Sequence, residues 1–295
     1  MRGFLSQARL LRSSVMNPLG EIEAIGSYVS DYRVGDRVLI HFYQSCGKCH
    51  YCRIGRENLC LNLKHFGFNT DGGYAEYAVV GSRHLVKLPP QVSYDACILV
   101  DAGATSYHAV NRIARLMLGE TAMVMGAGGV GLMLVQMAKI AGANVFAVDV
   151  KDEKLELAKK LGADWTINSR RSNLSQEVAA LTNGRGVDAA FETVGFEDTY
   201  RSCLECLGRG GRLVIIGYQL ESYLPRVHPS QLISKENSVL TSRAGTREEL
   251  VKVVELAGRG RVRMAVTERF PLDLVNEALS RLRKGEIAGR ACVTP

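Results

Sequence analysis

The chain has 295 residues, of which 46% are hydrophobic and 23% charged, and it contains only 7 prolines. This composition is typical of a globular protein with room for two packed domains, and it excludes a disordered chain. The formal net charge of +7 is spread along the sequence, with acidic residues between the basic ones, so we expect no nucleic-acid partner.

Two stretches bear on location in the cell. Residues 1–15, MRGFLSQARLLRSSV, are rich in Arg and Ser and contain no acid, as a transit peptide would, but they lack the long apolar core of a secretory signal. We therefore expect a cytoplasmic protein whose thiols stay reduced. Residues 121–138 carry no charge, yet their central glycine cluster predicts a strand, a turn and a helix rather than a membrane span.

The expected elements change character along the chain. Residues 33–86 alternate apolar and polar positions between glycine-marked turns, which predicts a small β-rich barrel or sandwich. From about residue 102, strands expected at 121–126, 144–150, 188–195 and 212–218 alternate with helices at 128–142 and 151–163. Such alternation predicts an α/β, doubly wound parallel sheet covered on both faces. A helix at 246–260, a short strand, a second helix and a last strand at 290–295 close the chain.

Four of the eight cysteines lie in one short stretch, CGKCHYCRIGRENLC, with intervals of two, two and seven residues. Four soft thiolates are what a tetrahedral zinc ion needs, and a set of four leaves no position for water or substrate. The sequence therefore predicts a structural zinc site, with an iron–sulfur cluster as the alternative that also takes four thiolates. The predicted ligands are Cys46, Cys49, Cys52 and Cys60.

The remaining cysteines are expected in the core. Cys203 and Cys206 form a C-x-x-C pair, but they fall on a predicted helix with apolar neighbours, so packing is favoured over redox work. Cys97 and Cys292 are also interpreted as core residues.

A glycine-rich turn follows the strand at 121–126. Its G-x-G-x-x-G pattern opens a helix, where the glycines permit a tight turn and close approach of a pyrophosphate, and the helix N-terminus favours phosphate charge. The glycines of the pattern are Gly126, Gly128 and Gly131, and Gly129 and Val130 are predicted cofactor contacts within it. The alternative is a glycine-rich turn with no ligand.

The nature of the cofactor depends on Asp149, which ends the next strand 18 residues beyond Gly131. An acid there accepts hydrogen bonds from the adenosine ribose and repels a 2′-phosphate, so NAD is favoured over NADP. The nearby Lys151 and Lys154 keep NADP open as the alternative.

Taken together, these motifs resemble the zinc-containing medium-chain alcohol dehydrogenases, most of all their archaeal and bacterial branch. The resemblance runs from about Gly20 to Pro295 and includes VGDRV, the cysteine loop, DGGYAEYAVV, DAGATSYHAV, GAGGVG, VDVKDEKLELAKKLGA and KGEIAGRACV. It implies a partial GroES-like catalytic domain at 1–102, a Rossmann NAD-binding domain at 103–245, and a segment at 246–295 that returns to the catalytic domain. A homodimer or homotetramer acting on a small alcohol or carbonyl substrate is also implied.

The resemblance further assigns roles to single residues. Asp149 and Lys154 would meet the adenosine ribose, Arg290 the pyrophosphate, Thr105 the nicotinamide, and Val194 the cofactor as well. Asp101 falls where the family places the third ligand of its catalytic zinc; the alternative is that it caps the helix that starts at about Ala102.

The sequence departs from the family in its first forty residues. The family's first two catalytic ligands are a Cys and the His of a Gly-His-Glu segment, yet the earliest Cys here is Cys46 and the earliest His is His41. One carboxylate cannot retain zinc, which makes a catalytic zinc doubtful. Three interpretations follow: a shortened product of an NAD-dependent alcohol dehydrogenase gene, a metal-free medium-chain reductase acting on enones, or a non-catalytic NAD-binding protein.

Overall fold

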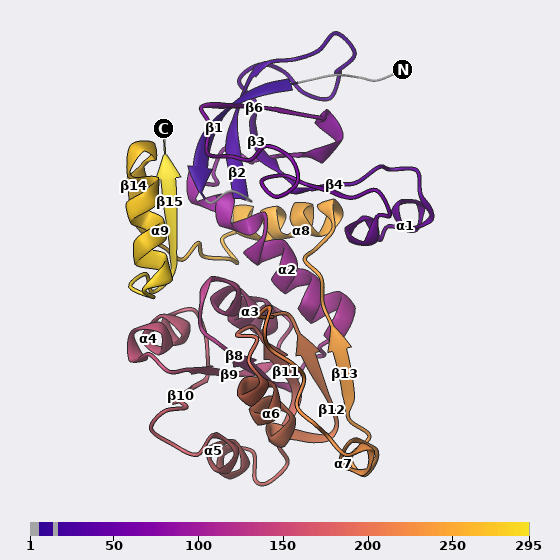
Figure 1. Ribbon diagram of the computed structural model, residues 1–295, viewed down its shortest axis with the longest axis vertical. Coiled ribbons are helices and arrows are strands. Elements are labelled where there is room, and N and C mark those ends of the chain that lie inside the picture. Colours follow the sequence, from indigo (N-terminus) through magenta and orange to yellow (C-terminus); the bar gives the residue numbers. More distant parts are fainter. Residues whose placement is uncertain (1–5, 14–16, 295) are drawn as a thin grey trace. The chain divides into compact units, whose positions relative to one another are not determined.

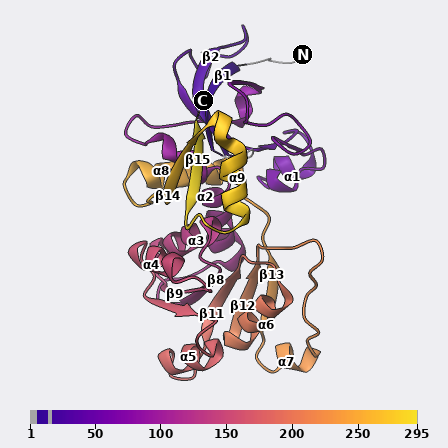
Figure 2. The same ribbon diagram turned by 60° about the vertical axis from the view of Figure 1, so that its left-hand side comes forward.

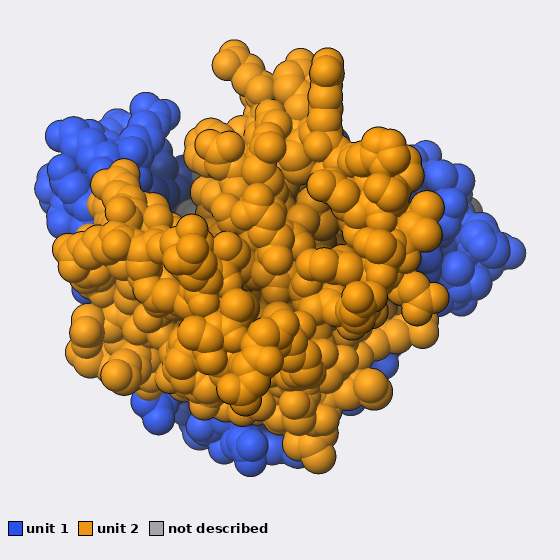
Figure 3. Space-filling view, turned by 90° about the horizontal axis from the view of Figure 1, so that it is seen from below, with its two compact units in different colours: residues 1–104, 244–295 blue, residues 105–243 orange. Residues whose placement is uncertain are grey.

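A computed structural model describes residues 6–13 and 17–294 of the chain. The chain divides into two compact units, one of residues 1–104 with 244–295 and one of residues 105–243, which Figure 3 colours separately. No helix in the described part of the chain is long and apolar enough to cross a membrane. The uncharged stretch at 121–138 is divided between a strand and a helix, as predicted.

The first unit is built on a five-stranded antiparallel sheet of order β6-β1-β2-β3-β7. Its strands are β1 (Ser6–Ser13), β2 (Asn17–Ala24), β3 (Arg37–Ile40), β6 (Tyr77–Val80) and β7 (Leu85–Lys87). Leu19 and Leu39, which lie opposite each other on β2 and β3, are fully buried, so the sheet has a well-packed face. Both β1 and β2 lie before residue 33, where the predicted β-rich region begins, so these two strands were not predicted.

Short elements follow these strands and lead to the end of the unit's first segment. They are β4 (Tyr43–Gln44), α1 (His50–Arg53), η1 (Glu57–Leu59), β5 (Lys64–His65), η2 (Ser82–His84) and η3 (Tyr94–Leu99). Helix α2 (Ala102–Tyr107) begins where the sequence placed a helix start, and a π-helical turn, η4 (His108–Ala114), continues it.

The C-terminal segment completes the first unit. It contains α8 (Arg247–Gly258), β14 (Val266–Pro271), η5 (Leu272–Leu274), α9 (Val275–Arg283) and β15 (Arg290–Thr294). Thr246 and Glu249 form a reciprocal capping box that fixes the start of α8. Helix α9 lies beside the parallel pair β14-β15 in both Figure 1 and Figure 2, where Phe270, Ala278 and Val293 form a small core.

The second unit is a six-stranded parallel sheet of order β10-β9-β8-β11-β12-β13 (Figure 1). Its strands are β8 (Thr121–Met125), β9 (Asn144–Asp149), β10 (Trp165–Asn168), β11 (Val187–Glu192), β12 (Leu207–Ile215) and β13 (Ser238–Thr241). Its helices are α3 (Gly129–Ile140), α4 (Asp152–Lys160), α5 (Leu174–Leu181), α6 (Glu197–Cys206) and α7 (Pro229–Ile233).

Both faces of this sheet are covered, which confirms the predicted doubly wound architecture. Met123 on β8 packs in one cluster with residues of α5 and α6, such as Val178 and Cys203. Val124, the next residue on β8, points to the opposite face, where it lies close to Gly131 of α3. The strand order reverses between β8 and β11, and ligands of such sheets bind at that reversal, outside the carboxyl ends of the strands.

Candidate functional site

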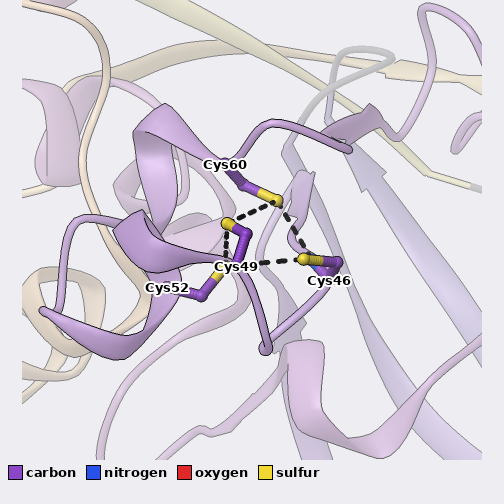
Figure 4. A group of neighbouring side chains, drawn as sticks. All are labelled: Cys46, Cys49, Cys52 and Cys60. Carbon is purple, nitrogen blue, oxygen red and sulfur yellow. Dashed lines mark hydrogen bonds between the residues drawn. The ribbon is translucent and has the colours of Figure 1, made fainter.

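The four cysteines predicted as metal ligands converge on one point. Their sulfur atoms all lie within 4.8 Å of one another (Figure 4). The Sγ–Sγ distances are 3.5 Å for Cys49–Cys52, 3.9 Å for Cys49–Cys60 and 4.0 Å for Cys46–Cys52. Four sulfurs bound at 2.3 Å to one tetrahedral ion would be separated by about 3.8 Å. The arrangement therefore fits a single ion and is too tight to enclose a multi-atom cluster.

Backbone amides surround these sulfurs. Cys60 Sγ accepts hydrogen bonds from the amides of Cys46 (3.2 Å) and Asn62 (3.4 Å). Hydrogen bonds from the amides of Lys48 and Cys49 lower the pKa of the Cys46 thiol to about 6. Amide donors of this kind stabilise thiolate charge and orient the ligands, which is the support that a metal centre needs around it.

The segment that carries the four cysteines, residues 46–60, is called the cysteine lobe here, and it is tied to the start of α8. Glu57 of η1, which lies between Cys52 and Cys60, accepts a hydrogen bond from the amide of Arg247. The ring nitrogens of the buried His41 lie 3.1 Å from Tyr43 O and 3.2 Å from Gly245 O. The earliest histidine of the chain is therefore part of the backbone packing, and it does not replace a catalytic ligand.

The glycine-rich turn lies at the strand-order reversal of the second unit. Gly126 has φ +94°, which only glycine adopts without strain, and its carbonyl accepts from Thr193 Oγ1 at 3.2 Å, just beyond β11. A Cβ on Gly131 would lie 1.7 Å from Gly126 O, so the third glycine is required for helix and strand to pack. A Cβ on Gly128 would meet nothing within 4 Å, which leaves open space above the second glycine.

Gly129 and Val130 form the first turn of α3, where backbone N–H groups lack partners within the helix. Val194 lines the turn from the other side, because a Cβ on Gly126 would lie 2.7 Å from Val194 Cγ2. The structure thus brings Gly126–Gly131 and Val194 together from β8, α3 and the end of β11.

Asp149 lies beside the same turn. Its Oδ2 accepts from Ala127 N at 2.8 Å, and its Oδ1 accepts from Val150 N at 2.7 Å and Lys151 N at 3.1 Å. The carboxylate is therefore held at the carboxyl end of β9, only partly buried, next to the phosphate-binding candidate. Lys154 lies in the first turn of α4 and is also partly exposed.

Sequence reasoning missed Glu192, the buried last residue of β11. Its Oε1 accepts from Val194 N (2.9 Å), Gly195 N (2.9 Å) and Thr199 Oγ1 (2.7 Å), while Oε2 has no hydrogen-bond partner among the residues that the structure describes. Burial raises the pKa of this carboxyl group. Glu192 thereby fixes the loop that presents Val194, and the signal for it in the sequence was an acid directly after the apolar run AAF.

In the first unit, Asp101 lies near Arg290 of β15, with 3.9 Å between Asp101 Oδ2 and Arg290 Nη2. Thr105, the first residue of the second unit, is buried in α2. Across residues 6–13 and 17–294, the four cysteines form the only group of three or more His, Cys, Asp or Glu side chains placed to hold a metal. The described residues around Asp101 therefore do not fit a catalytic zinc site.

Two protein-family models match the chain. An alcohol dehydrogenase GroES-like domain matches residues 14–90, and a zinc-binding dehydrogenase domain matches residues 129–259.

Curated and solved proteins agree with these matches. An alcohol dehydrogenase of Geobacillus stearothermophilus is 37% identical over 276 residues, which are 92% of this chain and 80% of that protein. An NAD-dependent alcohol dehydrogenase of Saccharolobus solfataricus is 34% identical over 282 residues, which are 94% of this chain and 80% of that protein. The crystal structure of the alcohol dehydrogenase from Aeropyrum pernix superimposes with a TM-score of 0.92 at 35% identity, covering 100% of this chain and 93% of that one.

Proposed function

Since the chain belongs to the zinc-containing medium-chain alcohol dehydrogenase family, we propose that it is an NAD-dependent enzyme that transfers a hydride between an alcohol and an aldehyde or ketone. The observation that carries the proposal is the glycine-rich turn at the strand-order reversal, with Asp149 beside it. The relatives named NAD-dependent alcohol dehydrogenases support the same cofactor.

NAD, when bound, would supply the hydride acceptor, and this chain would supply its binding site. The space above Gly128 would admit the pyrophosphate against the N-terminus of α3, where free N–H groups and the helix dipole favour negative charge. Asp149 would accept from the adenosine ribose hydroxyls and repel a 2′-phosphate, and Lys154 would contact the same ribose. Val194 would contact the cofactor beyond the turn, and Thr105 and Arg290 are proposed to meet the nicotinamide and pyrophosphate.

The cysteine lobe is proposed to hold a structural zinc ion. Support comes from the sulfur separations, which match one tetrahedral ion, and from the amide donors around Cys46 and Cys60. Because four thiolates saturate the ion, this zinc would fold the lobe and take no part in hydride transfer.

A catalytic zinc has no comparable support. Asp101 has Arg290 nearby, and among the described residues it belongs to no group of three or more Cys, His, Asp or Glu side chains placed to hold a metal. This observation favours a second candidate function, a metal-free reductase that uses NADH to reduce activated enones. In both functions the nucleotide site is the same.

Zinc content and substrate range of the purified chain test the two candidates. We expect about one zinc ion per chain, held by the cysteines. Oxidation of NADH with simple aldehydes or ketones would support the alcohol dehydrogenase function, and turnover with enones alone would support the reductase. Binding of NADH without turnover of either substrate class would overturn both and leave a non-catalytic NAD-binding protein.

A further inference from the structure

Two buried cysteines outside the lobe lie in direct contact. Cys97 belongs to η3 and Cys292 to β15, both in the first unit, and their sulfur atoms are 3.4 Å apart. Only 2% of Cys97 and 5% of Cys292 is exposed, so the two thiols meet in the interior. A disulfide has an S–S distance of about 2.05 Å, so the sulfurs would have to approach by about 1.4 Å for a bond to form.

The backbone around the two thiols is held on both sides. Arg269 of β14, which is opposite Cys292 in the strand register, donates to both carboxylate oxygens of Asp95 at 2.6 and 2.7 Å. On the other side, Arg290 of β15 lies near Asp101. Two charged contacts therefore hold β14 and β15 against residues 95–101. Cys97, which contacts Cys292, lies between the two acids of these contacts in the sequence.

The surroundings also favour reactivity of one thiol. The hydrogen bond with Cys97 is the main cause that lowers the pKa of Cys292, and the positive charge of Arg269 acts in the same direction. A thiol with more thiolate character is the better nucleophile toward an oxidant or a disulfide. Cys97 is then in place as the resolving thiol.

We propose that Cys97 and Cys292 are a redox-sensitive thiol pair that hydrogen peroxide converts into a disulfide, which fastens β15 to η3. The Cys292 thiolate attacks one peroxide oxygen, the O–O bond breaks, and the released hydroxide takes up a proton to become water. The resulting Cys292 sulfenic acid is attacked by the Cys97 sulfur, an S–S bond forms, the S–O bond breaks, and a second water leaves with the Cys97 proton. The two sulfurs lose two electrons, and the peroxide gains them.

The remaining cysteines provide an internal comparison. Cys203 and Cys206 are equally buried, but they are three residues apart on one helix, and burial raises the pKa of both thiols. They should therefore stay reduced under the same treatment. The proposal does not rest on the cofactor or on the zinc ion.

The test is mass spectrometry of the folded chain after brief exposure to hydrogen peroxide, alkylation and tryptic digestion. We expect residues 88–112, which contain Cys97, to be linked to residues 291–295, which contain Cys292, and the link to disappear after reduction. Residues 202–209, which contain both Cys203 and Cys206, should be recovered fully alkylated. The crosslinked chain should melt several degrees higher than the reduced chain, because a long loop is closed.

The variant Cys97→Ser keeps a similar volume and a donor for Asp95 O, which Cys97 Sγ approaches at 3.5 Å. Its melting temperature should not respond to peroxide, and Cys292 should then stop at the sulfenic or sulfinic acid. A linkage that forms only after denaturation, or linkage of Cys97 to a cysteine of the lobe in place of Cys292, would overturn the proposal. So would recovery of both peptides alkylated after peroxide treatment of the folded wild-type chain.

Discussion

The cysteine lobe and the neighbourhood of Asp101 belong to the same unit, yet they differ in the groups that surround a candidate metal ligand. In the lobe, every ligand comes from one short loop, and the sulfurs face one another with amide donors behind them. Asp101 has a basic side chain nearby from the last strand of the chain and has no group of fellow ligands among the described residues. A metal site is therefore recognised by a complete set of ligands. One carboxylate at the position of a family ligand, such as Asp101, does not hold an ion by itself.

The largest effect should follow from breaking the lobe. Cys49→Ser removes a thiolate at the centre of the sulfur group, so zinc should fall from about one ion per chain to near none. The melting temperature should fall by about 10 °C, because metal-binding free energy stabilises this lobe. Elemental analysis and calorimetry measure both. The control Cys206→Ala removes a buried thiol outside the lobe and should leave the zinc content unchanged; loss of zinc in that variant would contradict the assignment.

The next largest effect should come from the third glycine of the turn. Gly131→Ala would place a Cβ 1.7 Å from Gly126 O, so α3 must move away from β8, and the unit should lose stability together with NADH affinity. Gly128→Ala is the matched control, because its Cβ meets nothing within 4 Å. It should melt like the wild type but bind NADH at least about tenfold more weakly, because the pyrophosphate needs the space above it. Equal NADH affinity in Gly128→Ala, measured by fluorescence titration, would count against the proposed phosphate position.

Some of these features could be predicted from the sequence, and others could not. The glycine turn, the cysteine lobe and the alternation of strands and helices were predicted because each is encoded within a few residues of local pattern. The strand β13 was missed, because its four residues are mostly exposed and carry no alternation of apolar and polar positions. The thiol contact of Cys97 with Cys292 and the ion pair of Asp101 with Arg290 could not be predicted, because each joins residues far apart in the chain through the packing of β15 on the residue 95–101 segment.

Cofactor preference should respond to Asp149 with an intermediate effect. Asp149→Asn keeps an acceptor for Ala127 N but removes the negative charge, so NADH affinity should fall about tenfold and discrimination against NADPH should weaken. Titration with both cofactors measures the change. Asp152→Asn is the control, because Asp152 is an exposed acid nearby that is paired with Arg171. It should alter neither affinity, and a shift toward NADPH in this control would show that net charge, rather than the position of Asp149, sets the preference.

The smallest effect is expected at Asp101. This variant tests most directly whether Asp101 is a metal ligand, as the cysteines of the lobe are proposed to be, or only an ion-pair partner. If Asp101 serves as the ion-pair partner of Arg290, Asp101→Asn should leave zinc at about one ion per chain and change NADH affinity by no more than a few-fold, because partly exposed ion pairs contribute little. The matched variant Asp95→Asn removes the other carboxylate that pairs with the β14-β15 strands and should behave alike. A wild-type chain with two zinc ions that loses one in Asp101→Asn, but not in Asp95→Asn, would restore Asp101 as a metal ligand and reject the metal-free interpretation.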